Sequence, residues 1–178
     1  HYAILGSAAM AEATGDSIAW AWLNKGYQHL ENIYWDSVAP FTGYFDISNY
    51  NHTQLQNKSF NATVDAITTH LLYLYLLTGD NLYADRMTEI AHQINTHLIG
   101  SMSGQSIGFV EAYDSQWNWD TNNTMTIMGH VLKAGWCLAR IHQVLPNSNL
   151  INNAEVLIND VIQKGYDHEF GGPYKDYN

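Results

Sequence analysis

The sequence predicts an all-α fold of helix-hairpin repeats about 65 residues long, amounting to roughly half of a six-hairpin (α/α) toroid barrel. Apolar residues recur at helical spacing through the long segments between polar loops. A Thr-Gly-Asp stop at residues 14–16 returns at residues 78–80, and the loop glycines Gly43, Gly108 and Gly172 share nearly the same interval. Such repeats either stack into an open superhelix or close into a ring, and long loops gathered at one end favour the ring.

The first repeat unit, residues 1–59, is predicted to hold two helices and a long loop. Small and apolar residues over 2–13 predict a helix that ends at the glycine turn. A second helix follows, with Asp16 able to cap its start and Trp35 at its end. The polar, Asn-rich stretch 36–59 then predicts a long loop with room for a short hairpin.

The second and third units, residues 60–121 and 122–178, follow the same plan. In each, a strongly apolar helix precedes a more polar one, as expected when the first lines an inner ring and the second covers it. We therefore expect one partial domain over residues 1–178, with the rest of a longer parent chain completing the barrel. The helices of these two units are expected over residues 60–77, 82–98, 124–145 and 150–162.

Composition and charge exclude several function classes. A net charge of −10 disfavours binding to nucleic acid and to anionic lipid. The longest apolar runs are well short of the ~20 residues that span a bilayer, and no basic-then-apolar leader opens the chain, so no membrane partner is expected. The single cysteine, Cys137, lies in an apolar helix and is expected to be an inert core residue. No zinc-type or phosphate-loop spacing occurs, so neither a metal nor a cofactor is expected.

The compartment and the oligomeric state are left open. Asn-x-Ser/Thr triplets can accept glycans in secreted proteins, but a chain this rich in Asn, Ser and Thr contains roughly two of them by chance. The triplets begin at Asn51, Asn57, Asn61 and Asn122.

Two polar pairs interrupt helices that should be apolar. Asn61 and Asp65 are four residues apart near the start of one predicted inner helix, and His130 and Lys133 are three apart on another. His130 is at the repeat equivalent of Asp65, so both pairs are expected to project at the loop end of the repeats. Lys133 lies in a nearly charge-free run, where an unpaired ammonium is costly, so we expect it to reach a pocket, water or a carboxylate such as Asp65. A hydrogen-bonded core residue is the alternative for His130.

The predicted loops add aromatic and acidic side chains. Aromatic faces suit the C–H faces of sugars, and carboxylates bind their hydroxyls, so these loops predict sugar binding. Packing of the loops on the rim of the barrel is the alternative for each residue. The candidates for direct sugar contact are Tyr44, Glu111, Trp117 and Trp119, and the same loops also carry Phe45, Asp46, Phe109, Tyr113, Asp114, Asp120 and Tyr174.

Residues 129–138, Gly-His-Val-Leu-Lys-Ala-Gly-Trp-Cys-Leu, resemble the Gly-His-x-x-x-x-x-Trp-x-Leu segment of the N-acylglucosamine 2-epimerase family, which includes cellobiose 2-epimerases and mannose isomerases. Residues 58–62 resemble the Lys-Ser-x-Asn-Ala that opens an inner helix of that family, and Gly171-Gly172 its loop glycine pair. The resemblance implies a six-hairpin (α/α) barrel of which this chain covers the middle. The resemblance also slightly favours a cytoplasmic location for the protein.

The resemblance also implies metal-free chemistry, in which one histidine removes the proton next to the carbonyl of an open-chain sugar and a second returns it. His130 matches one of these histidines, and the other is expected beyond Asn178. Two departures change the local charge, because the family commonly has Glu where Lys133 stands and His where Asp65 stands. Asp65 and Lys133 could replace the missing residues as a pair, or mark another sugar substrate or a protein that is no epimerase.

Three functions therefore remain open. The first is a sugar epimerase or isomerase, with His130 as acid and base and a mono- or disaccharide as substrate. The second is a glycoside hydrolase or lyase that uses two of the carboxylates Asp65, Glu111, Asp114 and Asp120. The third is a carbohydrate-binding domain without catalysis.

Overall fold

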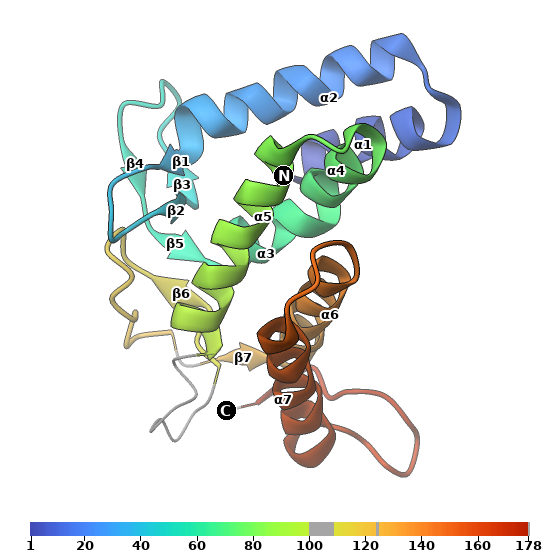
Figure 1. Cartoon of the computed structure of the whole chain (residues 1–178). Coiled ribbons are helices and arrows are strands. Elements are labelled where there is room, and N and C mark those ends of the chain that lie inside the picture. The colour runs from blue at the N-terminus through green and yellow to red at the C-terminus, as the bar shows by residue number, and fades with distance from the viewer. Residues whose placement is uncertain (100–108, 124, 178) are drawn as a thin grey trace. The chain divides into compact units, whose positions relative to one another are not determined.

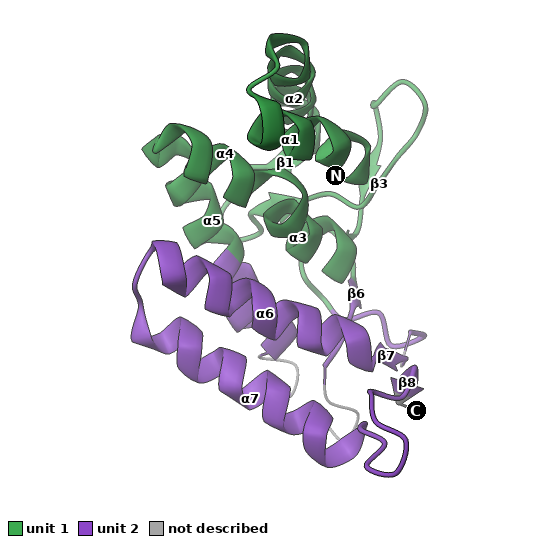
Figure 2. Cartoon of the chain, turned by 90° about the vertical axis from the view of Figure 1, so that its right-hand side faces the viewer, with its two compact units in different colours: residues 1–90, 113–118 green, residues 91–112, 119–178 purple. Residues whose placement is uncertain are grey.

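The computed structural model describes residues 1–99, 109–123 and 125–177 (Figure 1). The chain forms two compact units, which Figure 2 distinguishes by colour. Unit 1 comprises residues 1–90 and 113–118, and unit 2 comprises residues 91–112 and 119–178.

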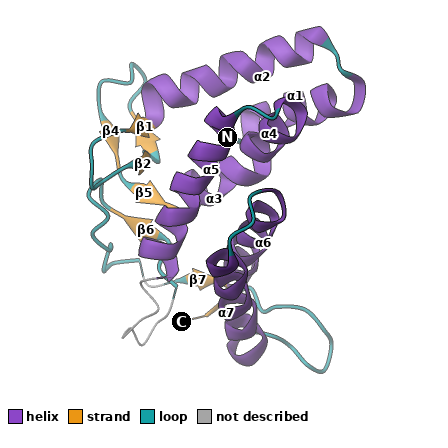
Figure 3. Cartoon of the chain, viewed as in Figure 1, coloured by secondary structure: helices purple, strands orange, loops and turns teal. Residues whose placement is uncertain are grey.

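Helices make up most of unit 1 (Figure 3). Two segments predicted as single helices each contain a π-helical turn, but the chain stays helical through it. The helical segments are α1 (Tyr2–Thr14), α2 (Ser17–His29), η1 (Leu30–Tyr34), α3 (Phe60–Ala66), η2 (Ile67–Leu71), α4 (Leu72–Thr78) and most of α5 (Asn81–Gln93).

The Thr-Gly-Asp stops end helices as the sequence predicts. Gly15 and Gly79 follow α1 and α4 with φ angles of 68° and 67°, in the left-handed region that glycine adopts at least cost. Asp16 then caps α2, since its carboxylate accepts the backbone N–H groups of Ile18 and Ala19. Local chemistry therefore fixes these helix ends.

Unit 1 is built on the continuous helix of α3, η2 and α4, which is buried on almost all sides as its apolar sequence predicts. Val64, Ile67, Leu71 and Leu74 are among its fully buried residues. The predicted long loop consists of short antiparallel strand pairs: β1 (Trp35–Asp36) with β2 (Gly43–Tyr44), and β3 (Ile47–Ser48) with β4 (Leu55–Gln56). Strand β5 (Lys58–Ser59) leads directly into α3.

Unit 2 is centred on the antiparallel hairpin of α6 (Met128–Val144) and α7 (Ser148–Lys164), visible in Figure 2. The buried face of α6 includes Cys137, which confirms its predicted core position. The other elements of unit 2 are η3 (Ile94–Ile99), β7 (Thr126–Ile127) and β8 (Asp176–Tyr177), while β6 (Ala112–Tyr113) has one residue in each unit.

Helix α6 begins at Met128, four residues later than the sequence predicts. The reason is that Thr126 and Ile127 pair as an antiparallel strand with Tyr177 and Asp176. A strand requires extended backbone angles, as at Ile127 with φ −89° and ψ 117°, so the helix starts only after this residue.

The division into three repeats of 1–59, 60–121 and 122–178 stays a prediction. Gly108, the second of the three loop glycines that indicate the repeat, lies outside the described residues. So does Thr124, the predicted first residue of the helix that is α6 in the structure. None of the helices in the described ranges is long and apolar enough to cross a lipid bilayer.

Candidate functional site

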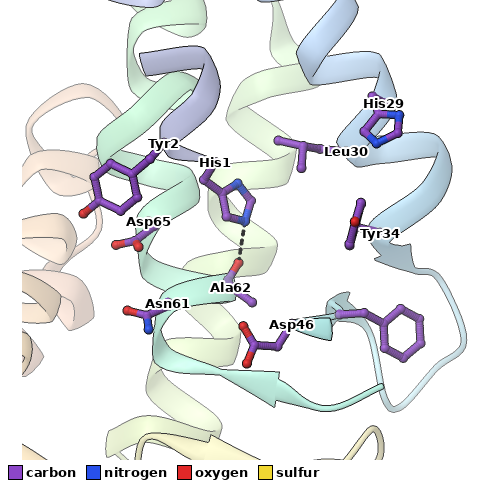
Figure 4. Close-up of a pocket in the computed structure, with 10 residues that line it drawn as sticks. His1, Tyr2, His29, Leu30, Tyr34, Asp46, Asn61, Ala62 and Asp65 are labelled. Carbon is purple, nitrogen blue, oxygen red and sulfur yellow. Dashed lines mark hydrogen bonds between the residues drawn. The ribbon is translucent and has the colours of Figure 1, made fainter. Parts of the chain in front are cut away.

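A cavity of about 410 Å³ opens in unit 1 and brings together residues from four parts of the chain (Figure 4). They come from the start of α1, the end of α2 with η1, the segment after β2, and α3. The lining residues are His1, Tyr2, His29, Leu30, Tyr34, Phe45, Asp46, Asn61, Ala62 and Asp65.

Asn61 and Asp65, the first predicted polar pair, both line this cavity. Ser59 caps the start of α3, since its hydroxyl oxygen accepts the backbone N–H of Ala62 at 3.1 Å. Asn61 is exposed, whereas Asp65 is only 4% exposed. His1 closes over the helix, with its Nε2 donating to the carbonyl of Ala62 at 3.0 Å (Figure 4).

The opposite wall combines the predicted loop residues Phe45 and Asp46 with Tyr34, which the sequence analysis did not single out. Tyr34 is fixed by its hydroxyl, which lies 2.9 Å from Ser48 Oγ, and Ser48 Oγ lies 3.0 Å from His52 Nδ1. The backbone N–H of Phe45 donates to the carbonyl of Tyr34 at 2.9 Å, and this bond places the following residue, Asp46, at the cavity. Contacts between segments that are separated along the chain place Tyr34 on this wall, and local spacing does not predict them.

Tyr44, predicted to contact sugar, is buried next to this cavity rather than among its lining residues. Its hydroxyl donates to Glu31, which also pairs with Arg86. Burial, followed by the negative charge of Glu31, raises the pKa of Tyr44 well above its ordinary value. The ring packs edge-on against His1 with centroids 5.0 Å apart, so Tyr44 supports a cavity residue.

Lys58, the first residue of the Lys-Ser-x-Asn-Ala segment, is fully buried. Its ammonium lies 2.7 Å from Asp36 Oδ2 and donates to the carbonyls of Phe41 and Ser115. The three donors of an ammonium thus meet three acceptors. Burial lowers the pKa of Lys58, and the hydrogen bond to Asp36 counteracts part of that effect.

Trp117, another predicted sugar contact, packs over this buried lysine. Its ring centroid lies 5.7 Å from Lys58 Nζ, and its Nε1 donates to the carbonyl of Thr42 at 3.0 Å. Gly43 makes the packing possible, since a Cβ there would lie 2.9 Å from Trp117 Cζ2. The indole is buried, as expected of the packing alternative.

In unit 2, His130 and Glu111 form a close pair. His130 Nδ1 lies 2.7 Å from Glu111 Oε2, and the other carboxylate oxygen accepts the backbone N–H of Ile127 at 2.7 Å. The His130 side chain is 28% exposed and that of Glu111 is 12% exposed. Glu111 is therefore held by a backbone hydrogen bond, and part of the His130 side chain is accessible to small molecules.

The two remaining predicted site residues also lie in unit 2. Trp119 is half-buried, and its Nε1 donates to the carbonyl of Asn123 at 3.4 Å. Lys133 is half-buried on α6, one helical turn after His130. A pair between Lys133 and Asp65 stays a prediction. In the described ranges, no group of three or more His, Cys, Asp or Glu side chains is arranged to hold a metal ion.

The comparisons with known proteins give the relationship of the chain. The family model of N-acylglucosamine 2-epimerase matches residues 1–177. The chain belongs to the N-acylglucosamine 2-epimerase family. This membership confirms the resemblance seen around Gly129 and Lys58. No curated protein matches the chain in sequence.

Two sugar-converting enzymes, an isomerase and an epimerase, are among the solved structures with the same fold. A D-mannose isomerase is 21% identical with a TM-score of 0.80, over 98% of this chain and 44% of that one. Cellobiose 2-epimerase from Bacillus thermoamylovorans B4167 is 14% identical with a TM-score of 0.78, over 93% of this chain and 44% of that one. These likenesses confirm the predicted fold class, an all-α helix-hairpin fold spanning roughly half of an (α/α) barrel.

The fold is not confined to epimerases. A glycoside hydrolase family 76 mannosidase from Bacteroides thetaiotaomicron VPI-5482 is 10% identical with a TM-score of 0.73, over 97% of this chain and 44% of that one. The chain thus spans less than half the length of each of these three structures. The fold alone does not choose between the two chemistries.

Proposed function

We propose that the protein is a sugar epimerase or aldose-ketose isomerase that removes and returns a proton next to the carbonyl of an open-chain sugar. The observation that carries the proposal is the pair of His130 and Glu111 in a member of the N-acylglucosamine 2-epimerase family. An imidazole held by a carboxylate through one nitrogen presents the other as a base. Its partial exposure leaves room for a substrate.

The proposed reaction proceeds in two proton transfers. His130 takes the proton from the carbon next to the carbonyl, and the electrons of that C–H bond move to form an enediol or enediolate. Return of a proton to the same carbon from the other face gives the epimer, and return to the neighbouring carbon gives the ketose or aldose. A second acid is needed for return from the other face, and the family resemblance assigns it to a histidine beyond Asn178.

Sugar binding is proposed for the cavity of unit 1. Asn61 is exposed there and offers an amide that can both donate to and accept from hydroxyls. Asp65 and Asp46 add carboxylates, and Phe45 adds an apolar face. This mixture suits a monosaccharide or disaccharide.

The test follows hydrogen exchange at carbon 2 by NMR, after full-length protein is incubated in D₂O with aldoses, ketoses and disaccharides. We expect exchange with at least one sugar and a loss of at least about a thousandfold in His130→Ala. His92→Ala, which removes an exposed histidine from α5, should retain the wild-type rate. Binding without exchange for every sugar tested would reject the proposal. Because the proposed chemistry is metal-free, a chelator should leave the exchange rate unchanged.

Asn61→Ala tests the assignment of the cavity. Loss of one hydrogen bond to the sugar should raise KM by about tenfold with little change in kcat. Asn152→Ala, on the exposed side of α7, is the matched control and should behave as wild type. An unchanged KM in Asn61→Ala would remove this residue from the sugar site.

A glycoside hydrolase is the second candidate, favoured by the mannosidase fold and by the two carboxylates, Asp46 and Asp65, that line one cavity. It predicts release of new reducing ends from an oligosaccharide, lost in Asp46→Asn, and no deuterium in intact monosaccharide. Sugar binding with neither reaction would support the third possibility, a carbohydrate-binding domain.

A further inference from the structure

The carboxylate of Glu111 is held in place by contacts within the protein. Its Oε2 lies 2.7 Å from His130 Nδ1, and its Oε1 accepts the N–H of Ile127, the residue before α6. The segment around it is fixed as well, since the carbonyl of Phe109 accepts a hydrogen bond from the Thr126 hydroxyl. Both oxygens of the carboxylate are therefore engaged by the start of the helix that carries His130.

This geometry restricts where His130 can carry its proton. An ionised carboxylate only accepts hydrogen bonds, so the nitrogen facing Glu111 must donate. A neutral imidazole has one N–H, and when Nδ1 holds it, the lone pair is on Nε2. The arrangement thus determines both the tautomer and the direction of the ring.

We propose that Glu111 is the positioning residue of His130, which holds the proton on Nδ1 and thereby makes Nε2 the nitrogen that removes the substrate proton. The catalytic part rests on the proposed function, whereas the tautomer does not. This role differs from the direct sugar contact that the sequence analysis expected for Glu111. It also accounts for the high burial of a carboxylate whose neighbour, His130, stays accessible.

Glu111→Gln provides a sharp test because the amide has only one acceptor. The N–H of Ile127 needs an oxygen, so the amide nitrogen of the glutamine must turn toward His130. An N–H that faces Nδ1 requires the lone pair there, which moves the imidazole proton to Nε2. The substitution therefore inverts the tautomer while it changes the shape of the side chain very little.

The experiment records long-range ¹H–¹⁵N spectra of full-length protein labelled with ¹⁵N-histidine, at about pH 9, where an imidazole is neutral. Loss of one signal set in His130→Asn identifies the ring. We expect a protonated Nδ1 and an unprotonated Nε2 in the wild type, and the reverse in Glu111→Gln. Glu155→Gln, which removes an exposed carboxylate from α7, should leave the spectrum of His130 unchanged.

The wild-type spectrum is decisive even if Glu111→Gln does not fold. A proton on Nε2 in the wild type would overturn the proposal, and so would an unchanged tautomer in a folded Glu111→Gln. In the exchange assay, Glu111→Gln should lower kcat by at least about a hundredfold with KM nearly unchanged, and Glu155→Gln should lower neither.

The two proposals fail in different ways. If no sugar exchanges but the tautomer follows Glu111, the positioning role stands and the epimerase proposal falls. If sugar exchanges but the wild-type ring is protonated on Nε2, the epimerase proposal stands and the positioning role falls.

Discussion

The two units differ in how deeply they bury a paired, charged or titratable side chain. In unit 1, Lys58 is fully buried and all its donors meet acceptors, including Asp36. In unit 2, the pair of His130 and Glu111 keeps the imidazole 28% exposed. A buried, saturated ion pair is costly to break and has no donor left for a ligand. A pair whose imidazole is 28% exposed contributes less to stability than a buried one, and part of the ring stays accessible to a ligand.

Removal of the buried ammonium should have the largest effect. Lys58→Met leaves the carboxylate of Asp36 and two carbonyls without their donor, and we expect the free energy of unfolding to fall by about 3–5 kcal/mol. Denaturant unfolding measures the change. Lys25→Met, an exposed lysine of α2, should change stability by less than about 1 kcal/mol. Equal effects of the two variants would contradict the structural role of Lys58.

Acid pH should reveal a second buried group of unit 1, His70. Its Nδ1 lies 2.9 Å from Thr69 Oγ1, whose hydroxyl donates to the carbonyl of Asp65, while no partner for its buried Nε2 lies among residues 1–99, 109–123 and 125–177. Burial lowers the pKa of His70 to about 3. Below about pH 6.5 the unfolded chain therefore binds a proton that the folded chain does not, and stability falls as the pH falls.

We expect a loss of about 2 kcal/mol from this histidine between pH 7 and pH 5, measured by unfolding at each pH. His70→Leu should flatten this dependence, and His92→Leu, at an exposed site, should keep it. A slope that is the same in all three proteins would exclude His70 as its source.

Two buried tyrosines of unit 1 differ in whether the hydroxyl has a hydrogen-bond partner. The Tyr44 hydroxyl donates to Glu31, whereas the buried Tyr27 hydroxyl has no partner within the described part of the chain. We expect Tyr44→Phe to lower the free energy of unfolding by about 1 kcal/mol and Tyr27→Phe to leave it unchanged or raise it by a similar amount. Thermal unfolding of both variants checks this difference, and an equal loss of stability in the two would contradict it.

The alkaline limit of stability follows from the same tyrosines. Burial, with the negative charge of Glu31 as the next cause, raises the pKa of Tyr27 above its ordinary value. The unfolded chain therefore loses its tyrosine proton first, and stability falls as the pH rises above about 10. Tyr27→Phe should lessen that fall, and an unchanged fall would assign it to other groups.

The partly exposed pair of His130 and Glu111 in unit 2 should have the smallest effect on stability. His130→Asn is expected to change the free energy of unfolding by less than about 1 kcal/mol while it abolishes hydrogen exchange in sugars. A loss of stability comparable to that of Lys58→Met would show that His130 is a structural core residue, the alternative that the sequence left open.

Sequence by itself determined the features that depend on neighbours along the chain. Glycine ends a helix through its own φ angle, so the stops at Gly15 and Gly79 were predictable. Asn61 and Asp65 reach one cavity because residues four apart share a helix face. The fold class and the family could also be inferred, from the repeat spacing and the segment around His130.

Tertiary structure alone decided which distant residues meet. The partner of His130 comes from 19 positions earlier, and Lys58 finds acceptors at Asp36 and at Ser115, 57 residues later. The late start of α6 likewise depends on a strand about fifty residues further along. Such contacts follow from the path of the loops and from the need to pair each buried charge. The spacing of residues along the sequence predicts neither of these.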